Sequence, residues 1–475
     1  MSANDSTNGK NKMILFALVL GTFMTALDAT IVSVALPTMA QELGEAGHDT
    51  QNISWVLLIY TLMLCCFILL WSKIGSNKGY KKIFMTGIAI FSISSLMIGL
   101  CGFIEELGLN VIILLRALQG IGAGMSMAVS LAMVSTYLPK EIRGSSIGAV
   151  TLAASAGTAF GPAIGGILTT FHWSYIFFIN VPIGLFCILL CMKYMNIQEN
   201  LEKAKDKLDL LGAALLFVML FALIFYLNQG EDIGWTSDTG VALIFIMMLF
   251  AGLVFWWEQR VDDPLISIDM LRNTQLRRCC LITMMLFMSM AGSYLLIPYY
   301  LGYVQGYETI EYGFILIANS IGMMAVGPLV GKIADRTGQS KKFVVLGTIV
   351  CALGFFMMMG YNNDTGLVWI LISLFVMGAG VGMAMVASTN LSFEYVSESE
   401  NGQLSGLTNT FRQAGSSAGV AILNCVFMSG IVILGPMTYD LIPGLKHAFF
   451  IAMIICLLAF VVSMGLKDKE RVQKA

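Results

Sequence analysis

Fourteen apolar segments follow one another along this chain of 475 residues, and each is long enough to cross a lipid bilayer. The hydrocarbon core of a bilayer is about 30 Å thick, so a helix needs roughly 20 apolar residues to span it. The polar connections are too short to hold an independent folded unit. The sequence therefore predicts an all-α polytopic membrane protein with 14 transmembrane helices. The predicted spans cover residues 13–39, 53–75, 83–104, 110–137, 144–170, 175–196, 209–228, 240–257, 278–301, 312–334, 343–361, 366–390, 403–430 and 446–466.

The positive charges fall almost entirely on alternate connections between these spans. Of 27 Lys and Arg residues, Arg116 and Arg412 lie inside spans, and Lys446 lies in a connection of the other set. The remaining 24, which is 27 less these three, lie at the termini and in the even-numbered connections. Because Lys and Arg concentrate on the cytoplasmic side of a membrane, both termini are predicted to be cytoplasmic. Termini on the same side require an even number of spans, and fourteen is even.

Composition argues against several other classes of protein. Hydrophobic residues make up 57% of the chain and charged residues only 12%. The basic residues are scattered over short connections, which argues against a nucleic-acid partner. The three His residues are far apart, and no HExxH, GxSxG or phosphate-binding motif occurs. We therefore expect a monomer that is not an enzyme and needs neither a metal nor another cofactor.

A weak internal repeat divides the chain. The connection after the second span reads SKIGSNKGYKK (72–82), and the connection after the tenth reads GKIADRTGQSKK (331–342). Both are short, basic and punctuated by glycine. If the seventh and eighth spans are an insertion, the arrangement is 6+2+6, which is typical of transporters built from two parallel halves. The predicted parts are an N-terminal six-helix bundle (1–200), a linker with two inserted helices (201–260), and a C-terminal six-helix bundle (261–475).

The two inserted spans have few features that indicate a role in transport. No charged residue occurs between positions 210 and 228 or between 241 and 257. A helix that is apolar on every side suits contact with lipid better than the wall of a substrate cavity. We therefore expect the inserted pair to face the lipid as an appendage.

Asp28, in the first span, is the only acid well inside any span of the predicted N-terminal bundle. A carboxylate there costs about 2.5 kcal/mol or more on insertion scales, and such residues usually face a cavity and have a function. Burial disfavours the charged form of a carboxyl group, so Asp28 is a candidate proton carrier. Arg116, in the fourth span, is the obvious partner, directly or through Gln119 or water. The alternative is that Asp28 and Arg116 form a purely structural ion pair.

Small residues follow one another in the fifth span. Gly157, Gly161 and Gly165 recur at a spacing of four, which places them on one helix face, and Pro162 and Gly166 accompany them. Such a face lets another backbone approach closely, and a proline can kink a helix. We expect this face to form part of a gate between the two halves. Ordinary helix packing is the alternative.

Further residues are candidates for the wall of a substrate cavity. Arg412, in the thirteenth span, either binds an anionic group or pairs with an acid such as Glu394 or Asp335. Aromatic side chains inside spans either line a cavity or pack against helices and the membrane interface. The full set of cavity candidates is Phe23, Tyr60, Gln119, Tyr294, Tyr299, Phe411 and Arg412.

Four segments resemble motifs of one known family, the major facilitator superfamily, and within it the fourteen-span drug:proton antiporters. LDATIVSVALP (27–37) resembles the first-span motif of that group, and LLRALQGIGAG (114–124) resembles the fourth-span motif. AGTAFGPAIGG (156–166) resembles the fifth-span signature found in exporters, and HWSYIFFINVPIG (172–184) is similar to a segment of the fourteen-span branch. The resemblance implies a major facilitator fold and a role for Arg116 in proton transfer.

The connection motif of the family is matched in only one half. Asp335 and Arg336 occupy its acid and arginine positions in the second half, whereas Ser76 and Asn77 stand there in the first. In the family, the acid helps to latch the cytoplasmic side. We therefore predict that Asp335 and its connection supply more of the closure in this protein.

Together these patterns predict proton-coupled efflux of amphipathic or lipophilic compounds by alternating access, driven by the proton gradient. Because Asp28 is the only strong acid candidate, neutral or singly charged substrates are favoured over dications. A nutrient or metabolite uptake symporter or facilitator, or a lipid-handling membrane protein, remains the alternative. The predicted location is the cytoplasmic membrane of a cell, and the predicted partners are protons, the bilayer and a small-molecule substrate.

Overall fold

The computed structural model of the protein describes residues 3–42, 50–104, 108–195, 209–261, 270, 272–307, 309–397, 400–430, 432–435 and 438–468. Almost all of this chain is helical, as the sequence predicts. The principal helices are α1 (Ala3–Glu42), α2 (Thr50–Lys78), α3 (Tyr80–Cys101), α4 (Leu109–Tyr137), α5 (Arg143–Thr169), α6 (Tyr175–Phe178), α7 (Asn180–Tyr194), α8 (Leu210–Ile233), α9 (Asp238–Glu258), α11 (Thr274–Tyr299), α12 (Thr309–Thr337), α13 (Ser340–Met358), α14 (Leu367–Glu394), α15 (Asn401–Ser429) and α16 (Ile442–Met464).

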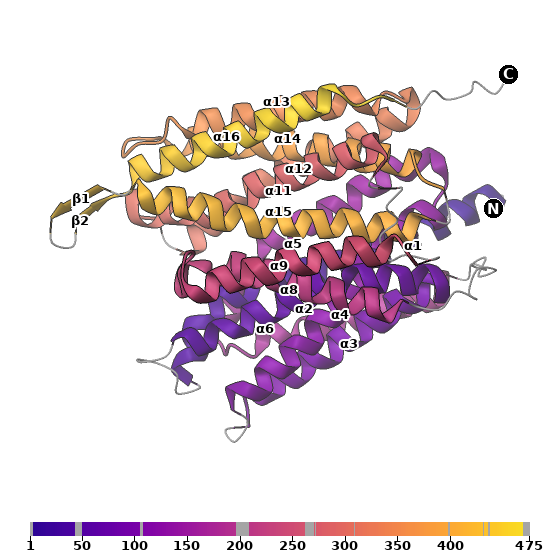
Figure 1. Ribbon diagram of the computed structural model, residues 1–475, viewed down its shortest axis with the longest axis horizontal. Coiled ribbons are helices and arrows are strands. Elements are labelled where there is room, and N and C mark those ends of the chain that lie inside the picture. The colour runs from indigo at the N-terminus through magenta and orange to yellow at the C-terminus, as the bar shows by residue number, and fades with distance from the viewer. Residues whose placement is uncertain are drawn as a thin grey trace.

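Short elements complete the architecture. A 3₁₀ turn, Lys140–Ile142, precedes α5, and a π-helical turn, Tyr300–Val304, continues α11. An antiparallel hairpin of β1 (Val432–Gly435) and β2 (Thr438–Asp440) joins α15 to α16, where the sequence predicted only a connection. The hairpin projects from one end of the helical body (Figure 1).

Within the described residues, eleven helices are long and apolar enough to cross a membrane, and the bent helix α5 brings the number to twelve. The other two predicted spans are helical but do not meet this test. The apolar part of α8 is shorter, Leu211–Leu227, and α15 carries the polar side chains of Asn409, Arg412 and Gln413. A polytopic membrane protein is therefore confirmed, while the count of 14 spans stays a prediction.

Helix α5 is bent as the sequence predicts for a proline-containing span. Its segments Lys140–Thr158 and Ala163–Thr169 meet at 42°. The break between them contains Pro162, which cannot donate the backbone hydrogen bond of a regular helix.

The helices pack as two groups with separate cores. In the first, α1 packs against α5, and α4 packs against α2 and α3; in the second, α14 packs against α12 and α13, and α11 against α15. One buried apolar cluster lies almost wholly among α1–α7 and another among α11–α16. Figure 1 shows the two groups as layers, the second above the first, with the beginning of α1 and the end of α16 at the same end.

The groups contact each other mainly through α5 with α12 and α2 with α15, and also through α4 with α15 and α5 with α14. Their closest approach lies at the end where α4 leads to α5 and α12 leads to α13. Because Lys140 lies in the first connection and Lys341 at the start of α13, we call it the basic end. A side chain on Gly144 would collide with the backbone of Gly331, and one on Gly402 would meet the carbonyl of Ser72 at 3.0 Å.

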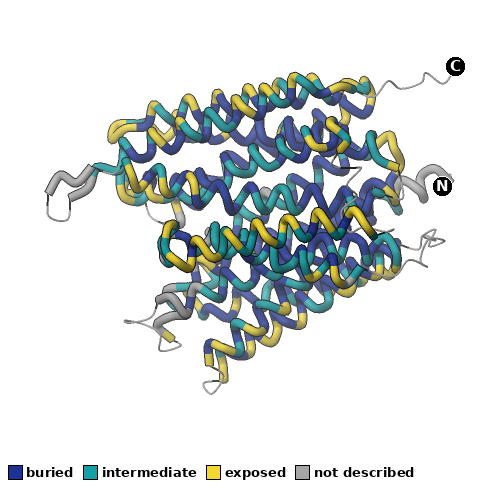
Figure 2. Tube along the Cα trace, in the orientation of Figure 1, coloured by how far each residue is buried: buried dark blue, intermediate teal, exposed yellow. Residues whose placement is uncertain are grey.

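Burial follows this arrangement. Figure 2 shows the buried residues concentrated where helices face one another and the exposed ones along the outer sides of the bundle. Many exposed residues are large and apolar, including Phe245, Phe356 and Val461. In water such a surface would be unfavourable, but it matches the hydrocarbon of a bilayer.

The inserted helices differ from each other in their surroundings. Helix α9 is mostly exposed, as expected for contact with lipid. Helix α8 instead packs against both α2 and α15, with Leu216 and Leu220 buried beside Leu69 and Leu407. The expectation that the pair is only a lipid-facing appendage is therefore wrong for α8. The first residues of the predicted part 201–260, positions 201–208, lie outside the described residues.

Candidate functional site

Asp28 and Arg116 form a direct ion pair within the first helix group. Nη1 of Arg116 lies 2.6 Å from Oδ2 of Asp28, and both side chains are fully buried. The same nitrogen donates to Oε1 of Gln119 at 2.6 Å, and Nε of Arg116 donates to the carbonyl of Val56 at 2.9 Å. The pair is therefore direct, and Gln119 supports it from one helical turn away.

Two amides complete the shell of the carboxylate. Nε2 of Gln119 and Nδ2 of Asn180 donate to Oδ1 of Asp28, at 3.0 and 2.9 Å. Nε2 of Gln119 also donates to the hydroxyl of Ser95, at 2.6 Å. All four side chains are fully buried. Hydrogen bonds to a charged group are stronger than neutral ones, and α1, α3, α4 and α7 meet around this buried polar network. Nη2 of Arg116 and Oδ1 of Asn180 are buried in it without a hydrogen-bond partner.

Tyr60, on α2, touches this network from the side. The guanidinium of Arg116 lies over its ring, 4.3 Å from the centroid, a distance suited to a cation–π interaction. Its hydroxyl donates to the carbonyl of Thr25 at 3.1 Å. Tyr60 also lines the cavity described next, whereas Asp28 and Arg116 do not. One aromatic ring thus separates the ion pair from the cavity.

A cavity of about 330 Å³ lies between the two helix groups, near the middle of α1, α11 and α15. Its volume is at the low end of the range for pockets that bind small molecules. Its wall consists of apolar side chains and of side chains that carry a hydroxyl group, with Arg412 and Gln413 in addition. The lining residues are Thr25, Ala26, Ala29, Thr30, Tyr60, Thr61, Leu64, Met127, Thr151, Ala154, Thr158, Phe287, Met290, Ala291, Tyr294, Arg412, Gln413, Ser416, Ser417 and Val420.

Three of the seven predicted cavity residues line this space: Tyr60, Tyr294 and Arg412. Nδ2 of Asn319, on α12, donates a hydrogen bond to the hydroxyl of Tyr294, on α11, and so orients the tyrosine side chain. The other four candidates are elsewhere. Gln119 belongs to the Asp28 network, and the remaining three are Phe23, Tyr299 and Phe411.

These three aromatic residues pack outside the cavity. Phe23 packs against the apolar cluster that includes Leu27 and Ile31. Tyr299 is 41% exposed and stacks on Tyr303, with ring centroids 5.9 Å apart. Phe411 packs against the cluster formed by α2, α8 and α15. These three residues therefore pack against other side chains and do not line the cavity.

Arg412 extends from α15 into the cavity. Within the described part of the chain, its guanidinium has no carboxylate partner and no hydrogen bond. It lies 5.5 Å from the ring centroid of Phe287 and near the side chain of Cys65. Asp335, one of the two acids considered as its partner, lies at the basic end against Gly144. Of the alternatives for Arg412, pairing with an acid is not observed.

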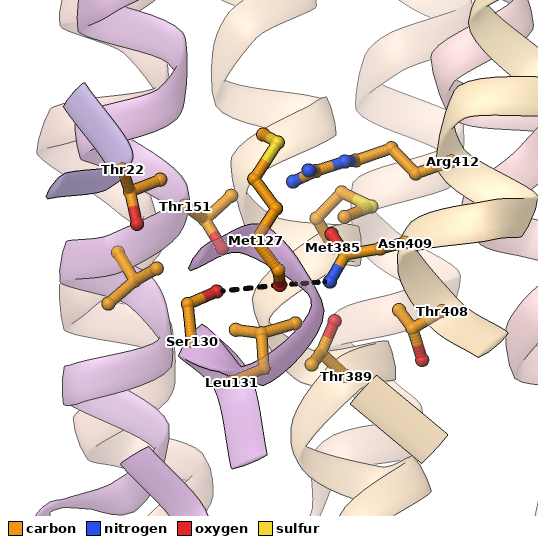
Figure 3. A pocket seen from close by; sticks show the side chains of 11 residues that line it. Thr22, Met127, Ser130, Leu131, Thr151, Met385, Thr389, Thr408, Asn409 and Arg412 are labelled. Carbon is orange, nitrogen blue, oxygen red and sulfur yellow. Dashed lines mark hydrogen bonds between the residues drawn. The ribbon is translucent and has the colours of Figure 1, made fainter. Parts of the chain in front are cut away.

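The floor of the cavity is closed by a contact between the groups. Nδ2 of Asn409, on α15, donates to the carbonyl of Met127, on α4, at 2.9 Å. The hydroxyl of Ser130 donates to the same carbonyl at 3.1 Å. Figure 3 shows both hydrogen bonds, with Arg412 above them reaching from α15 toward Met127 and Thr151. The adjacent space, of about 10 Å³, has room for one water molecule.

The glycine face of α5 packs against α1, in its own helix group. A side chain on Gly157 would meet the carbonyl of Phe23 at 2.5 Å, and one on Gly165 would meet the carbonyl of Ile31 at 2.9 Å. A side chain on Gly161 would collide with Thr30. The expectation that this face lies between the halves is therefore corrected: its partner is the segment of α1 that carries Asp28. Gly166 has no atom within 4 Å of such a position.

Asp335 connects the two groups at the basic end. Its Oδ1 and Oδ2 accept from the backbone N–H of Gly144 at 3.0 and 2.9 Å, and Oδ2 accepts from Ser145 N–H at 3.2 Å. The acid thus sits at the N-terminus of α5, where free N–H groups favour negative charge. Arg336, next to it, is exposed.

The corresponding position in the first group makes no such connection. The hydroxyl of Ser76 donates to the carbonyl of Lys73 in its own helix, at 2.8 Å. Nδ2 of Asn77 is buried without a hydrogen-bond partner. The two groups are therefore held by an acid on one side of the basic end and by close glycine packing on the other.

Sequence reasoning missed two sets of residues. Asn180 lies in the segment 172–184, but nothing in that segment indicates that it contacts Asp28. One side of α11 faces the cavity, with Phe287, Met290 and Ala291 in addition to Tyr294. Their spacing of three and four residues could have indicated this side. No group of three or more His, Cys, Asp or Glu side chains in the described residues is arranged to hold a metal ion.

Comparison with known proteins agrees with this architecture. A profile of the family described as Major Facilitator Superfamily matches residues 18–420. The multidrug resistance protein Stp of Mycobacterium tuberculosis is 29% identical over 421 residues, which cover 88% of this chain and 76% of that protein. Multidrug resistance protein 3 of Bacillus subtilis is 27% identical over 432 residues, covering 90% and 81%.

A solved structure shares the fold at low sequence identity. The crystal structure of the human organic anion transporter MFSD10 (TETRAN) superposes with a TM-score of 0.68 at 16% identity. The match covers 95% of this chain and 99% of that one.

Proposed function

The chain belongs to the major facilitator superfamily, and we propose that it exports amphipathic small molecules in exchange for protons, by alternating access between its two helix groups. The names of the relatives at 27–29% identity, which describe multidrug resistance, support export. The cavity between the groups supports a small-molecule substrate, because its walls combine apolar surface with hydroxyl groups, an amide and one arginine.

The observation that carries this proposal is the position of the ion pair beside the cavity. Asp28 would carry the proton. Protonation would remove its charge and leave the Arg116 cation without a counter-charge in a buried site, which is strongly unfavourable. Arg116 would then move or find another partner. Because its guanidinium lies over the ring of Tyr60, which lines the cavity, such a movement would displace a residue of the cavity wall.

Closure of one side of the transporter is assigned to the basic end. The Asp335 carboxylate at the N-terminus of α5 would hold the groups together there, and it would be released when the cavity opens to that side. The glycine face of α5 would keep α1, with Asp28, fixed against α5 during the movement. Arg336 would serve as an exposed part of the same latch.

The proton gradient is sufficient as a driving force. One charge that moves across about 100 mV gains about 2.3 kcal/mol, and each 1.4 kcal/mol corresponds to a tenfold ratio. One proton would therefore sustain roughly a 40-fold gradient of a neutral compound. We assign the protein to the cytoplasmic membrane with both termini in the cytoplasm, because the positive charges lie on that set of connections.

The test is collapse of a pH gradient in energised inverted vesicles when lipophilic compounds are added. Wild-type protein is compared with Asp28→Asn and with Asp364→Asn, which changes an exposed acid in the connection between α13 and α14. Collapse in wild type and in Asp364→Asn, but not in Asp28→Asn, is the expected result. If no compound causes collapse although the protein is inserted, the exporter proposal fails.

A further inference from the structure

The cavity between the helix groups has a net positive lining. Arg412 is the one charged side chain among its lining residues. Asp28 and Arg116, the nearby ion pair, are fully buried, compensate each other and are not among the lining residues. A substrate in the cavity therefore meets a single cation and no carboxylate.

This cation lacks a counter-charge within the described residues. Its neighbours include the Phe287 ring and the Cys65 side chain, and no ion pair or hydrogen bond with a described residue satisfies its five N–H donors. An arginine cannot lose its proton to relieve the cost of partial burial. An anion on the substrate would supply the missing partner, and a carboxylate or sulfonate fits the planar fork of the guanidinium.

The surroundings of Arg412 define the rest of the ligand. Ser416 lies one helical turn further along α15 and lines the same cavity. Opposite, Phe287, Met290 and Tyr294 form an apolar wall on α11. Such a site suits a compact aromatic body that carries one acidic group. A second negative charge would find no partner there, and a cation would be repelled.

We propose that the preferred substrates are amphipathic organic monoanions, held in this cavity by Arg412. The inference rests on the proposed export function but concerns only the charge of the ligand. It differs from the expectation drawn from the position of Asp28, because that acid does not line the cavity and cannot contact a cation bound there.

Binding tests the inference without any need for proton coupling. The detergent-purified protein is titrated with three probes of the same size and different charge: 1-naphthalenesulfonate, 1-naphthalenesulfonamide and trimethyl(1-naphthylmethyl)ammonium. The wild type is expected to bind the sulfonate at least about tenfold more tightly than the ammonium compound. Tighter binding of the ammonium compound would overturn the inference, and this ranking requires no variant.

Substitution of Arg412 then tests the assigned contact. Arg412→Gln is expected to raise the Kd for the sulfonate about 10- to 100-fold, the range for loss of a hydrogen bond to a charged group, and to leave the sulfonamide within about twofold. Arg412→Lys keeps the charge and should lose less. Arg277→Gln makes the same change at an exposed position of α11 and should alter nothing. An equal loss for sulfonate and sulfonamide would contradict the assignment.

Transport of the same probes in proteoliposomes separates this inference from the proposed function. If the sulfonate binds through Arg412 but no probe moves with protons, the export proposal fails and the binding assignment stands. If the ammonium compound drives proton movement that depends on Asp28 while the sulfonate does not bind, the export proposal stands and the anion inference fails.

Discussion

The Asp335 carboxylate and the backbone N–H of Gly144 join the two helix groups at the basic end, at 3.0 and 2.9 Å from the two carboxylate oxygens. The arrangement resembles a helix N-cap, except that the capping acid comes from a helix 191 residues away in the sequence. A cap of this kind stabilises its helix terminus only while the two groups are in contact.

Loss of this acid should loosen the basic end. In Asp335→Ala, the N–H groups of Gly144 and Ser145 lose their acceptor. A hydrogen bond to a charged group stabilises a structure by about 1.5–3 kcal/mol. Hydrogen–deuterium exchange of the peptide that contains these two residues should accelerate about 10- to 100-fold. Lys332→Ala, at an exposed position of the same helix, is the control.

The same residue should affect transport more than its counterpart in the first group. Ser76→Ala removes only a hydrogen bond within α2 and should leave export nearly unchanged. If Asp335→Asn has no effect on transport whereas Ser76 substitutions abolish it, the assignment of the latch to Asp335 is wrong.

The ion pair of α1 and α4 should show strong coupling in a double-mutant cycle. Arg116→Gln leaves the buried Asp28 without its cation and should lower the free energy of unfolding by about 3–5 kcal/mol. The double variant Asp28→Asn/Arg116→Gln removes both charges and should be more stable than Arg116→Gln alone. Denaturant unfolding in mild detergent measures all four proteins, and additive effects would show that the two side chains do not interact.

The glycine face of α5 should tolerate no side chain where it meets α1. Gly157→Ala would place a methyl group 2.5 Å from the Phe23 carbonyl and should cost about 1–3 kcal/mol through overpacking. Gly166→Ala changes a glycine of the same motif that has open space and should stay within about 0.5 kcal/mol of wild type. Thermal unfolding of the purified proteins compares them, and equal losses would refute close packing as the reason for these glycines.

Tyr60 should connect proton binding with substrate binding. Tyr60→Phe removes the hydrogen bond to the Thr25 carbonyl but keeps the ring below Arg116, so the number of protons moved per substrate should change little. Tyr60→Leu removes the ring and a cation–π interaction of about 0.5–2 kcal/mol, and this number should fall. Simultaneous measurement of proton and substrate fluxes tests the difference. A larger effect of Tyr60→Phe would assign the role to the hydroxyl.

Export of a monoanion should depend strongly on membrane potential. If one proton enters for each anion that leaves, two charges cross in the same electrical direction, so about 100 mV contributes about 4.6 kcal/mol, twice the value for one charge. Export of a neutral compound should gain half as much. The dependence of export on membrane potential is measured by imposing potassium diffusion potentials across proteoliposomes at equal pH on both sides. Anion export that does not depend on the potential would contradict such an exchange.

Local sequence patterns predicted the elements of the fold well, because the length and apolarity of a span are local properties. Helices α8 and α15 form where spans were predicted, but the packing of α8 and the lower hydropathy of α15 need separate explanations. The chain around Leu216 is apolar on all sides, so its sequence gives no sign of the two helices it covers. The polar face of α15, with Asn409 and Arg412, lowers its hydropathy because that face lines a cavity and not the lipid.

The candidate site was predictable only residue by residue. A lone acid and a lone arginine in apolar spans identified Asp28 and Arg116, because their cost in a membrane demands a reason. Their partner Asn180 was not predictable, since an amide can both donate and accept hydrogen bonds and so does not indicate which group it meets. The neighbour of the glycine face was also beyond prediction, because spacing defines a face but not the helix that it meets.

The position of α8 restricts how a compound dissolved in the bilayer could approach the cavity from the side. A transporter of two bundles has two lateral seams, here along α2 with α15 and along α5 with α12. Helix α8 covers the first seam. Its Phe217 ring packs against Phe67 of α2, and its Phe225 ring packs against Trp55 of α2. Sideways entry is thus asymmetric, and only the seam along α5 and α12 has no inserted helix over it in the described part of the chain. Helix α8, which adds no described residue to the lining of the cavity, thereby covers one of its two flanks.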